Sequence, residues 1–273
     1  MVSAKLIYFS PPPDGSRPYT NINSDPSTGE RGKNWVQKEH TVEIEDLRGK
    51  EGSVTLDTAG FQFLKKAAKH QSFATDDVIK NEYYPESIEL IKELTGASKV
   101  VLFDHTVRRN RPGDTEDTPG KRRPVAQVHV DQTPAAAEAR VHRHMPTSEV
   151  KSLLEHRYQI INLWRPIDNP AYDFPLTLCD YRSVDAQKDL VPVRLIYPDR
   201  EGETFGVKFS PEHKWKYMRG MNTDEVVFIK CFDSLQEGDV AVFTPHTGFQ
   251  DSTTPKDAPL RQSIELRALV FYN

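Results

Sequence analysis

The sequence predicts a mainly β protein, either a β-barrel or a jelly roll, with helices packed beside it. The first observation is a series of short strands in the second half, separated by turn signals such as Glu237-Gly-Asp and Asp199-Arg-Glu-Gly. The second is composition, because 37% hydrophobic and 10% aromatic residues among 273 supply a large core. The strands expected in this half span residues 158–165, 191–197, 204–209, 215–218, 225–232, 240–243 and 264–272.

The first half is expected to combine strands with bracing helices and irregular segments. Alternating or β-rich patterns predict strands at 4–9, 40–45, 98–103 and 126–132. Helical patterns cover 58–68, 75–80, 85–95, 134–144 and 148–156. Thr75 is a suitable N-cap, Pro85 suits a helix start, and Gly96 suits a helix end. Polar, Pro-rich stretches predict an irregular arm at 10–37 and a loop at 110–124.

We interpret the chain as a single domain with three parts. These are an N-terminal strand and irregular arm at 1–56, bracing helices at 57–97, and a jelly-roll core at 98–273. Length alone does not require a second domain, since all-β barrels of this size commonly stay single.

Charge and cysteine content narrow the class of partner. The net charge of −4 comes from 36 basic and 40 acidic residues, which argues against nucleic acid or an anionic membrane and favours a small-molecule substrate. Prolines at 11–13 interrupt any signal-length apolar run, and no later segment reaches membrane-spanning length, so we expect a cytoplasmic protein. Cys179 and Cys231 lack zinc-site spacing and are expected to be reduced, buried thiols. The sequence gives no indication of oligomeric state.

The most informative motif is His129-Val-Asp131. In a strand, residues two apart project to the same face, so both side chains can bind one ion. His246 follows an apolar segment far downstream and offers a third ligand. Two imidazoles and one carboxylate on one side of a metal are typical of non-haem Fe(II) oxygenases. For the His129–Asp131 pair alone, a histidine at a strand end, hydrogen-bonded to a turn carboxylate, is an equally good interpretation.

The last strand adds a candidate anion site. Arg261 and Ser263 share a face, and a guanidinium beside a hydroxyl suits a carboxylate. A keto acid such as 2-oxoglutarate would then bind the metal at one end and Arg261 and Ser263 at the other. Arg267 lies on the same face and is the main competitor, although roughly 20 Å further along the strand. Arg165 could help to bind the co-substrate, or could pair with a core carboxylate.

Several short motifs together resemble one family. They are Thr95-Gly-Ala, Phe103-Asp-His-Thr-Val-Arg108, His129-Val-Asp131, Asn162-Leu-Trp-Arg-Pro166, Pro175-Leu, Asp180-Tyr-Arg-Ser183, Phe232-Asp-Ser234, Pro245-His246 and Arg261-Gln-Ser-Ile-Glu-Leu-Arg267. From about residue 57 to the end, the chain resembles the Fe(II)/2-oxoglutarate-dependent oxygenases that include the aspergillic acid hydroxylase/desaturase, a gibberellin desaturase and a cephalosporin methoxylation protein.

The resemblance implies a double-stranded β-helix that uses Fe(II), 2-oxoglutarate and O2. It implies iron ligands at His129, Asp131 and His246, and hydroxylation or desaturation of an aliphatic position in a small molecule, often in secondary metabolism. His105, Arg108 and Arg267 are candidates for the substrate pocket. Two alternatives remain open: a cupin-like metal-binding isomerase or small-molecule binding protein without O2 chemistry, and a noncatalytic relative that keeps only the fold.

Overall fold

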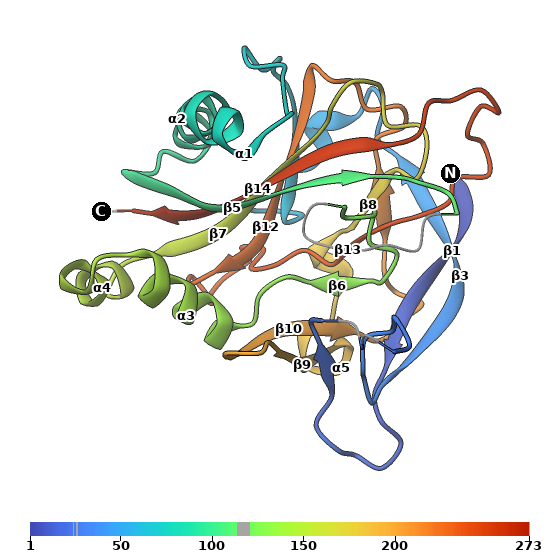
Figure 1. Ribbon diagram of the computed structural model, residues 1–273, viewed down its shortest axis with the longest axis horizontal. Coiled ribbons are helices and arrows are strands. Elements are labelled where there is room, and N and C mark those ends of the chain that lie inside the picture. Colours follow the sequence, from blue (N-terminus) through green and yellow to red (C-terminus); the bar gives the residue numbers. More distant parts are fainter. Residues whose placement is uncertain (24, 26, 114–120, 273) are drawn as a thin grey trace.

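Two β-sheets form the body of the protein, seen in a computed structural model that describes residues 1–273 except 24, 26, 114–120 and 273 (Figure 1). One sheet has nine strands in the order β1 (Val2–Ser10), β3 (Val36–Asp46), β11 (Trp215–Tyr217), β8 (Leu176–Cys179), β13 (His246–Gly248), β6 (His129–Val130), β10 (Glu201–Val207), β9 (Leu190–Ile196) and β2 (Tyr19–Asn21). The other has five, in the order β4 (Phe61–Lys65), β12 (Glu225–Asp233), β7 (Tyr158–Pro166), β14 (Gln262–Phe271) and β5 (Lys99–Arg109).

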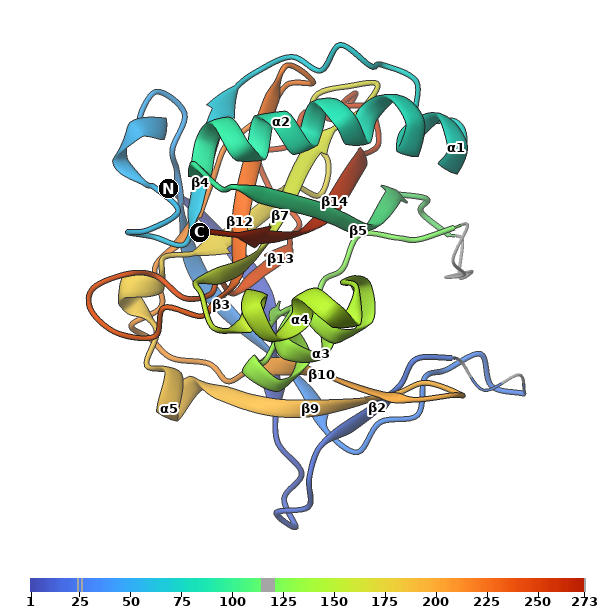
Figure 2. The same ribbon diagram turned by 90° about the vertical axis from the view of Figure 1, so that its left-hand side faces the viewer.

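The helices are short and lie beside the sheets. They are η1 (Glu51–Ser53), α1 (Asp76–Val78), η2 (Ile79–Tyr83), α2 (Tyr84–Thr95), α3 (Pro134–His144), α4 (Thr147–Leu154), η3 (Tyr181–Ser183) and α5 (Ala186–Asp189). Figure 2 shows α1 and α2 covering the outer face of the five-stranded sheet, while α3 and α4 lie between β5 and β10. Among the described residues, no helix has both the length and the apolar character that a membrane crossing requires.

The five-stranded sheet is buried on both faces. Side chains of its central strand β7 alternate between two apolar clusters, with Ile160 and Trp164 on the inner side and Ile161 and Leu163 on the outer side. The inner cluster also contains Leu178 of the nine-stranded sheet. The outer cluster contains the apolar residues of α2. The main core therefore lies between the two sheets, and a second core lies under α2.

The helix signals at 75–96 are confirmed. The Thr75 hydroxyl accepts a hydrogen bond from the Val78 N–H, as expected of an N-cap. Gly96 ends α2 in the left-handed conformation at φ 70°. The helices predicted at 134–144 and 148–156 are also present, as α3 and α4.

Two predicted elements are wrong. Residues 58–68 do not form a helix, because Gly60 has φ 90° and the next residues pair as β4 with β12, burying Phe61 and Phe63. Residues 240–243 alternate in burial as a strand would, but they join no ladder. The backbone N–H of Ala241 instead donates to the carbonyl of Asp57 at 2.8 Å.

The N-terminal segment is more than an arm. β1 pairs with β3 over nine residue pairs, and β3 continues the nine-stranded sheet through β11. Residues 1–56 therefore supply three strands to that sheet, and the jelly-roll core is not confined to 98–273. The segment at 10–37 is otherwise irregular, with β2 as its one complete strand among the described residues.

Candidate metal centre

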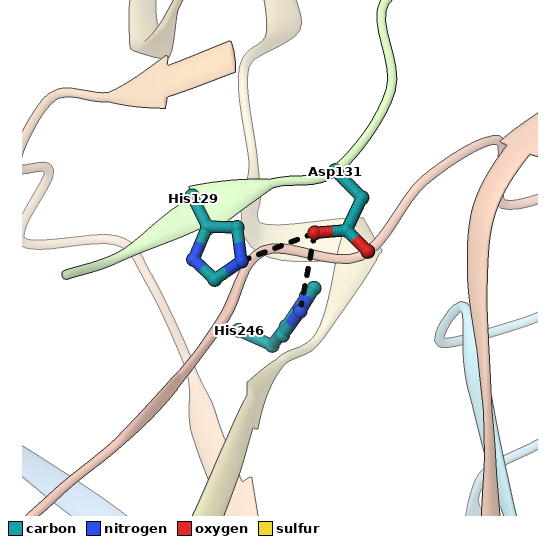
Figure 3. Close-up of side chains that lie close together, drawn as sticks. All are labelled: His129, Asp131 and His246. Carbon is teal, nitrogen blue, oxygen red and sulfur yellow. Dashed lines mark ion pairs between the residues drawn. The ribbon is translucent and has the colours of Figure 1, made fainter. Parts of the chain in front are cut away.

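Three ligand-bearing side chains converge where β6 and β13 meet. His246 pairs directly with His129 across these neighbouring strands, and Asp131 follows β6 by one residue. One ligand atom from each side chain lies within 4.8 Å of the others. Asp131 Oδ1 is 3.1 Å from His129 Nε2 and 3.8 Å from His246 Nε2. Figure 3 shows the three side chains pointing toward one another.

Backbone carbonyls orient both imidazoles. His129 Nδ1 lies 2.8 Å from the carbonyl oxygen of Gln127, and His246 Nδ1 lies 3.0 Å from that of Thr244. A protonated Nδ1 that donates to a carbonyl leaves Nε2 as the free lone pair, which is the usual second-shell support of a metal-binding histidine. The chain therefore presents two oriented nitrogen ligands beside a carboxylate.

Asp131 is held from its other side as well. Asn162 Nδ2 donates to Oδ2 at 2.7 Å, and Arg267 Nε lies 3.6 Å from the same oxygen. Burial opposes its charged form, but the His129 hydrogen bond and the charge of Arg267 hold the pKa of Asp131 well below its usual value. The carboxylate is therefore ionised and positioned for a cation.

The two histidines differ in pKa direction. Burial lowers the pKa of His246, and the neighbouring His129 adds to this. For His129, burial also opposes protonation, but the hydrogen bond to Asp131 outweighs it and the pKa is raised. The carboxylate favours protonation of both imidazoles, but only at His129, which hydrogen-bonds to it, does this outweigh burial.

Arg261 is a buried cation near the same strands. It is 3% exposed, its Nη1 donates to the carbonyl of Phe174 at 2.7 Å, and its guanidinium stacks 5.1 Å from the Trp164 ring. Its Nε donates to Ser263 Oγ at 3.3 Å, so the shared face predicted for this pair is present. Among the described residues, no carboxylate lies within ion-pair distance of the guanidinium. Burial, together with the charge of Arg108, lowers the pKa of Arg261 to about 9.

Arg267 has the opposite surroundings. It makes ion pairs with Glu265, with Asp104 at 3.2 Å and with Asp131 at 3.6 Å, and it donates to Thr106 Oγ1 at 3.0 Å. Burial opposes the charge, but these carboxylates raise its pKa. Arg267 is thus part of the triad's surroundings, because β14 places it opposite Asn162. Its charge is already compensated within the chain.

A cavity of about 860 Å³ opens onto the triad. His129 and Asp131 form part of its wall, together with Arg108, Arg267 and Arg140 of α3. The wall also has apolar and aromatic side chains, Ile22, Trp35, Phe174, Leu195 and Tyr197, as well as polar ones such as Thr106, Gln132 and Thr204. This volume is within the range of small-molecule sites and exceeds what a five-carbon keto acid needs. The site can therefore admit a second, larger molecule.

Comparison with known proteins identifies the family. A family model described as "Oxidoreductase/YMDC permease-like domain" matches residues 6–271. The hydroxylase/desaturase efuI of Hormonema carpetanum is 37% identical over 252 residues, covering 85% of this chain and 83% of that protein. The Fe(II)/2-oxoglutarate-dependent dioxygenase nvfI of Aspergillus novofumigatus is 33% identical over 272 residues, covering 97% and 95%. This chain belongs to the Fe(II)/2-oxoglutarate-dependent hydroxylase/desaturase family.

A solved structure supports both the family and the fold. The iron and alpha-ketoglutarate-dependent endoperoxidase NvfI superposes with a TM-score of 0.86 at 29% identity, covering 99% of this chain and 98% of that one. The prediction of a mainly β jelly roll with flanking helices is thereby confirmed. As a family member, the protein is a non-haem iron dioxygenase that uses Fe(II), 2-oxoglutarate and O2. These relatives do not support the alternative of a cupin-like isomerase or binding protein.

The residues present fit this cofactor set. Two imidazoles and one carboxylate are the donor set of non-haem Fe(II) oxygenases, with positions left open for co-substrate and O2. Two buried polar atoms on the inner face of β7, Asn162 Oδ1 and Trp164 Nε1, have no hydrogen-bond partner among the described residues. Asn162 touches Asp131 and Trp164 stacks under Arg261. The unpartnered atoms therefore lie between the metal ligands and the candidate carboxylate site.

The role of Asn162 was missed by sequence reasoning, since this residue appeared only within the resemblance motif. A signal was available for Asn162, because a buried amide in an apolar strand requires a polar partner. Its partner, Asp131, could not be identified from the sequence, since it is 31 residues away.

The structure contradicts two of the predicted site residues. Arg165 lies on the outer face of β7, where it donates to the carbonyl of Lys66 at 3.1 Å and packs over Tyr83. It therefore contacts neither the triad nor Arg261. His105 also faces outward, with its Nδ1 2.8 Å from Tyr84 Oη and its Nε2 3.2 Å from Asp76. It lines a separate cavity beside α1, not the one that contains the triad.

Proposed function

We propose that His129, Asp131 and His246 hold the Fe(II) of this dioxygenase. The observation that carries the proposal is the convergence of their ligand atoms within 4.8 Å at the wall of a cavity. The two Nδ1–carbonyl contacts support it, because they aim both Nε2 atoms at the same point as the carboxylate.

Arg261 and Ser263 receive the distal carboxylate of 2-oxoglutarate. Charge balance supports this choice over Arg267. Asp131 and the keto-acid end of the co-substrate would neutralise a divalent iron, which would leave the distal carboxylate to be matched by one cation. The Arg261 guanidinium is buried and has no carboxylate within ion-pair distance among the described residues, whereas that of Arg267 already has three. A bound carboxylate would remove the cost of burying Arg261 uncompensated.

The reaction is oxidation of an aliphatic C–H position of a small molecule, in secondary metabolism. When bound, iron and 2-oxoglutarate couple the reduction of O2 to the conversion of 2-oxoglutarate into succinate and CO2. Hydroxylation places one oxygen atom in the substrate, and desaturation removes two hydrogens and releases water. The chain's own residues orient the co-substrate through Arg261 and hold Asp131 ionised through Asn162 and Arg267. The apolar wall around Phe174 and Tyr197 keeps the reacting carbon away from bulk water.

Charge balance and the state of the cysteines support a cellular location and a class of partner. Near balance of 36 basic and 40 acidic residues supports a small-molecule partner over nucleic acid or membrane. Cys179 and Cys231 are free and buried, which supports a reducing compartment such as the cytoplasm. We place the entire chain in one oxygenase domain, since strands from residues 1–56 extend the sheet that carries the triad.

Anaerobic titration tests the metal assignment. Adding Fe(II) and then 2-oxoglutarate to the full chain should produce a weak visible charge-transfer absorption, and Asp131→Ala should abolish it. Asp104→Ala is the matched control, because Asp104 lines the same cavity and pairs with Arg267 but is not one of the three ligands. Absorption that persists in Asp131→Ala would disprove the assignment.

A further inference from the structure

Arg140 stands out among the cations of the triad cavity. It lies on α3, which begins one residue after Thr133, whose hydroxyl caps the helix by accepting from the Ala136 N–H. The helix thus follows the iron-binding strand β6 almost directly. Arg140 lines the cavity, and its guanidinium carbon lies 5.3 Å from the centre of the Phe103 ring. This stacking holds the planar head in place and leaves its N–H edge for another group.

No carboxylate within the described residues is close enough to pair with Arg140. Asp104, the nearest acid by its electrostatic effect, is 3.2 Å from Arg267 instead. The other charged neighbours are the cations Arg143 and Arg267. Burial, opposed by Tyr197 and reinforced by the two cations, lowers the pKa of Arg140. A positive charge is therefore kept in a partly buried position among like charges.

Among the other arginines that line the cavity, Arg267 has carboxylate partners, and Arg31, Arg108 and Arg122 make interactions of their own. Arg267 is matched by Glu265, Asp104 and Asp131. Arg108 donates to the carbonyl of Arg123 at 2.9 Å and makes further contacts. Arg261 belongs to the carboxylate site proposed above. A partly buried guanidinium without an anionic partner carries an uncompensated desolvation cost. Beside an oxidising centre, such a group is suited to bind an anionic ligand.

The rest of the wall indicates what carries that anion. Apolar and aromatic side chains, among them Phe174, Leu195 and Tyr197, share the wall with the arginines and with polar side chains. A free inorganic anion would leave this surface uncovered. A mainly apolar molecule with one acidic group would cover it and pair with the cation at the same time.

We propose that Arg140 binds a carboxylate of the substrate, so that the enzyme oxidises a carboxylated, mainly apolar small molecule. This inference rests on the proposed function, because it assigns the substrate class of the same site. It fixes one end of the substrate at α3 and directs the apolar body along the wall toward the triad. Specificity then depends on a charged hydrogen bond that a neutral analogue cannot make.

Calorimetric binding to the anaerobic enzyme, loaded with Fe(II) and 2-oxoglutarate, tests the proposal. The probes are 4-phenylbutyric, dodecanoic and dehydroabietic acids, each with its methyl ester. At least one acid should bind about tenfold or more tightly than its ester. Arg140→Gln should abolish that preference, and Arg140→Lys should retain part of it. Arg143→Gln should retain it in full, since Arg143 is exposed on the same helix and does not line the cavity.

Three outcomes overturn the proposal: no acid that binds better than its ester, a preference that survives in Arg140→Gln, or a preference lost equally in Arg143→Gln. Loss of 2-oxoglutarate affinity in Arg140→Gln would also overturn it, because Arg140 would then serve the co-substrate. Failure of the proposed function appears separately, as absence of the Fe(II) and 2-oxoglutarate absorption in the unmodified protein before any probe is added.

Discussion

The protein contains two groups of charges, each with buried members, that differ in how far the chain itself pairs them. In the Asp233 cluster, formed by Asp57, Arg157, Lys230 and Asp233, two cations match two carboxylates. Lys230 Nζ lies 2.7 Å from Asp57 and 2.9 Å from Asp233, and Arg157 Nη2 lies 2.6 Å from Asp233. Arg140, in the triad cavity, and Arg261, just before β14, have no carboxylate within ion-pair distance of their guanidinium groups among the described residues.

This difference separates structural charges from ligand-binding charges. The Lys230 side chain is 0% exposed, so its charge is tolerable only because the chain supplies both carboxylates. Arg261 is almost as deeply buried, yet the chain supplies it only neutral partners, a carbonyl and a hydroxyl. The Asp233 cluster is paired within the protein alone, whereas the two proposals above pair Arg261 and Arg140 with bound ligands.

Asp233→Asn should produce the largest loss of stability. The substitution leaves the buried Lys230 and Arg157 with one carboxylate between them, so the free energy of unfolding should fall by about 3 kcal/mol. Urea unfolding followed by fluorescence measures this. Asp104→Asn is the control: the Asp104 side chain is 55% exposed in its pair with Arg267, and its loss should cost at most about 1 kcal/mol. Equal losses of unfolding free energy in the two variants would contradict the distinction between structural and ligand-binding charges.

Arg261→Met should affect binding and stability in opposite ways. The affinity for 2-oxoglutarate should fall by about 10- to 100-fold, because one charged hydrogen-bonding pair is lost. Without ligand, the melting temperature should stay the same or rise, since an unpaired buried cation is removed. Arg165→Met is the control on the other face of the sheet. It should leave 2-oxoglutarate affinity unchanged and lower the melting temperature. The reverse pattern would assign the carboxylate site to Arg165 instead of Arg261.

The stability supplied by Asp233 should depend on pH in one direction. Burial opposes its ionisation, but Arg157, Lys230 and Gln159 hold its pKa below the ordinary value. A carboxyl with a depressed pKa in the folded state stabilises the protein above its unfolded pKa of about 3.9, and that contribution disappears as pH falls through the folded value. The difference in unfolding free energy between the unmodified protein and Asp233→Asn should therefore be constant near neutral pH and shrink below about pH 4. Urea midpoints across an acid pH series measure it, and a difference that grows on acidification would contradict this assignment.

Strand periodicity, a local property, was sufficient to predict two of the three triad residues. Alternation places His129 and Asp131 on one face, and Arg261 and Ser263 on one face, whatever the rest of the chain does. The pairing of His129 with His246 is not local, and it depended on recognising a ligand type at the end of a distant apolar segment. The motifs that resembled a known family supplied the rest.

Other features could not be predicted, because several strands are buried on both faces. Alternation places Trp164 and Arg165 on opposite sides of β7 but does not say which side faces the triad, and all nine residues of this strand are buried. The same ambiguity misplaced His105, whose strand β5 is covered by α2 on one side. Residues 58–68 are rich in Ala and Lys, and pairing with β12 overrides that helical preference. These outcomes depend on tertiary packing.

The cysteines provide the smallest expected effect. Burial raises the pKa of the Cys231 thiol, and the negative charges of Asp131 and Glu265 raise it further. Burial likewise raises the pKa of Cys179 to about 12, and the side chain of this residue packs in a different apolar cluster from that of Cys231. Neither forms an appreciable amount of thiolate at neutral pH, so a disulfide reagent should release almost no colour from the native protein and two equivalents in urea.

Comparing the two thiols tests whether the cavity opens more easily than the rest of the fold. If Cys231 reacts before Cys179 without denaturant, the uncompensated charges near the triad lower local stability, and added 2-oxoglutarate with Fe(II) should slow that reaction by ligand linkage. If both thiols react at the same rate, and that rate is set by global unfolding, the region around the triad does not open separately. Packing then stabilises the positions of Arg261 and Arg140 even without ligands. Mass spectrometry of the labelled peptides distinguishes these results, because Cys179 and Cys231 are the only thiols in the sequence.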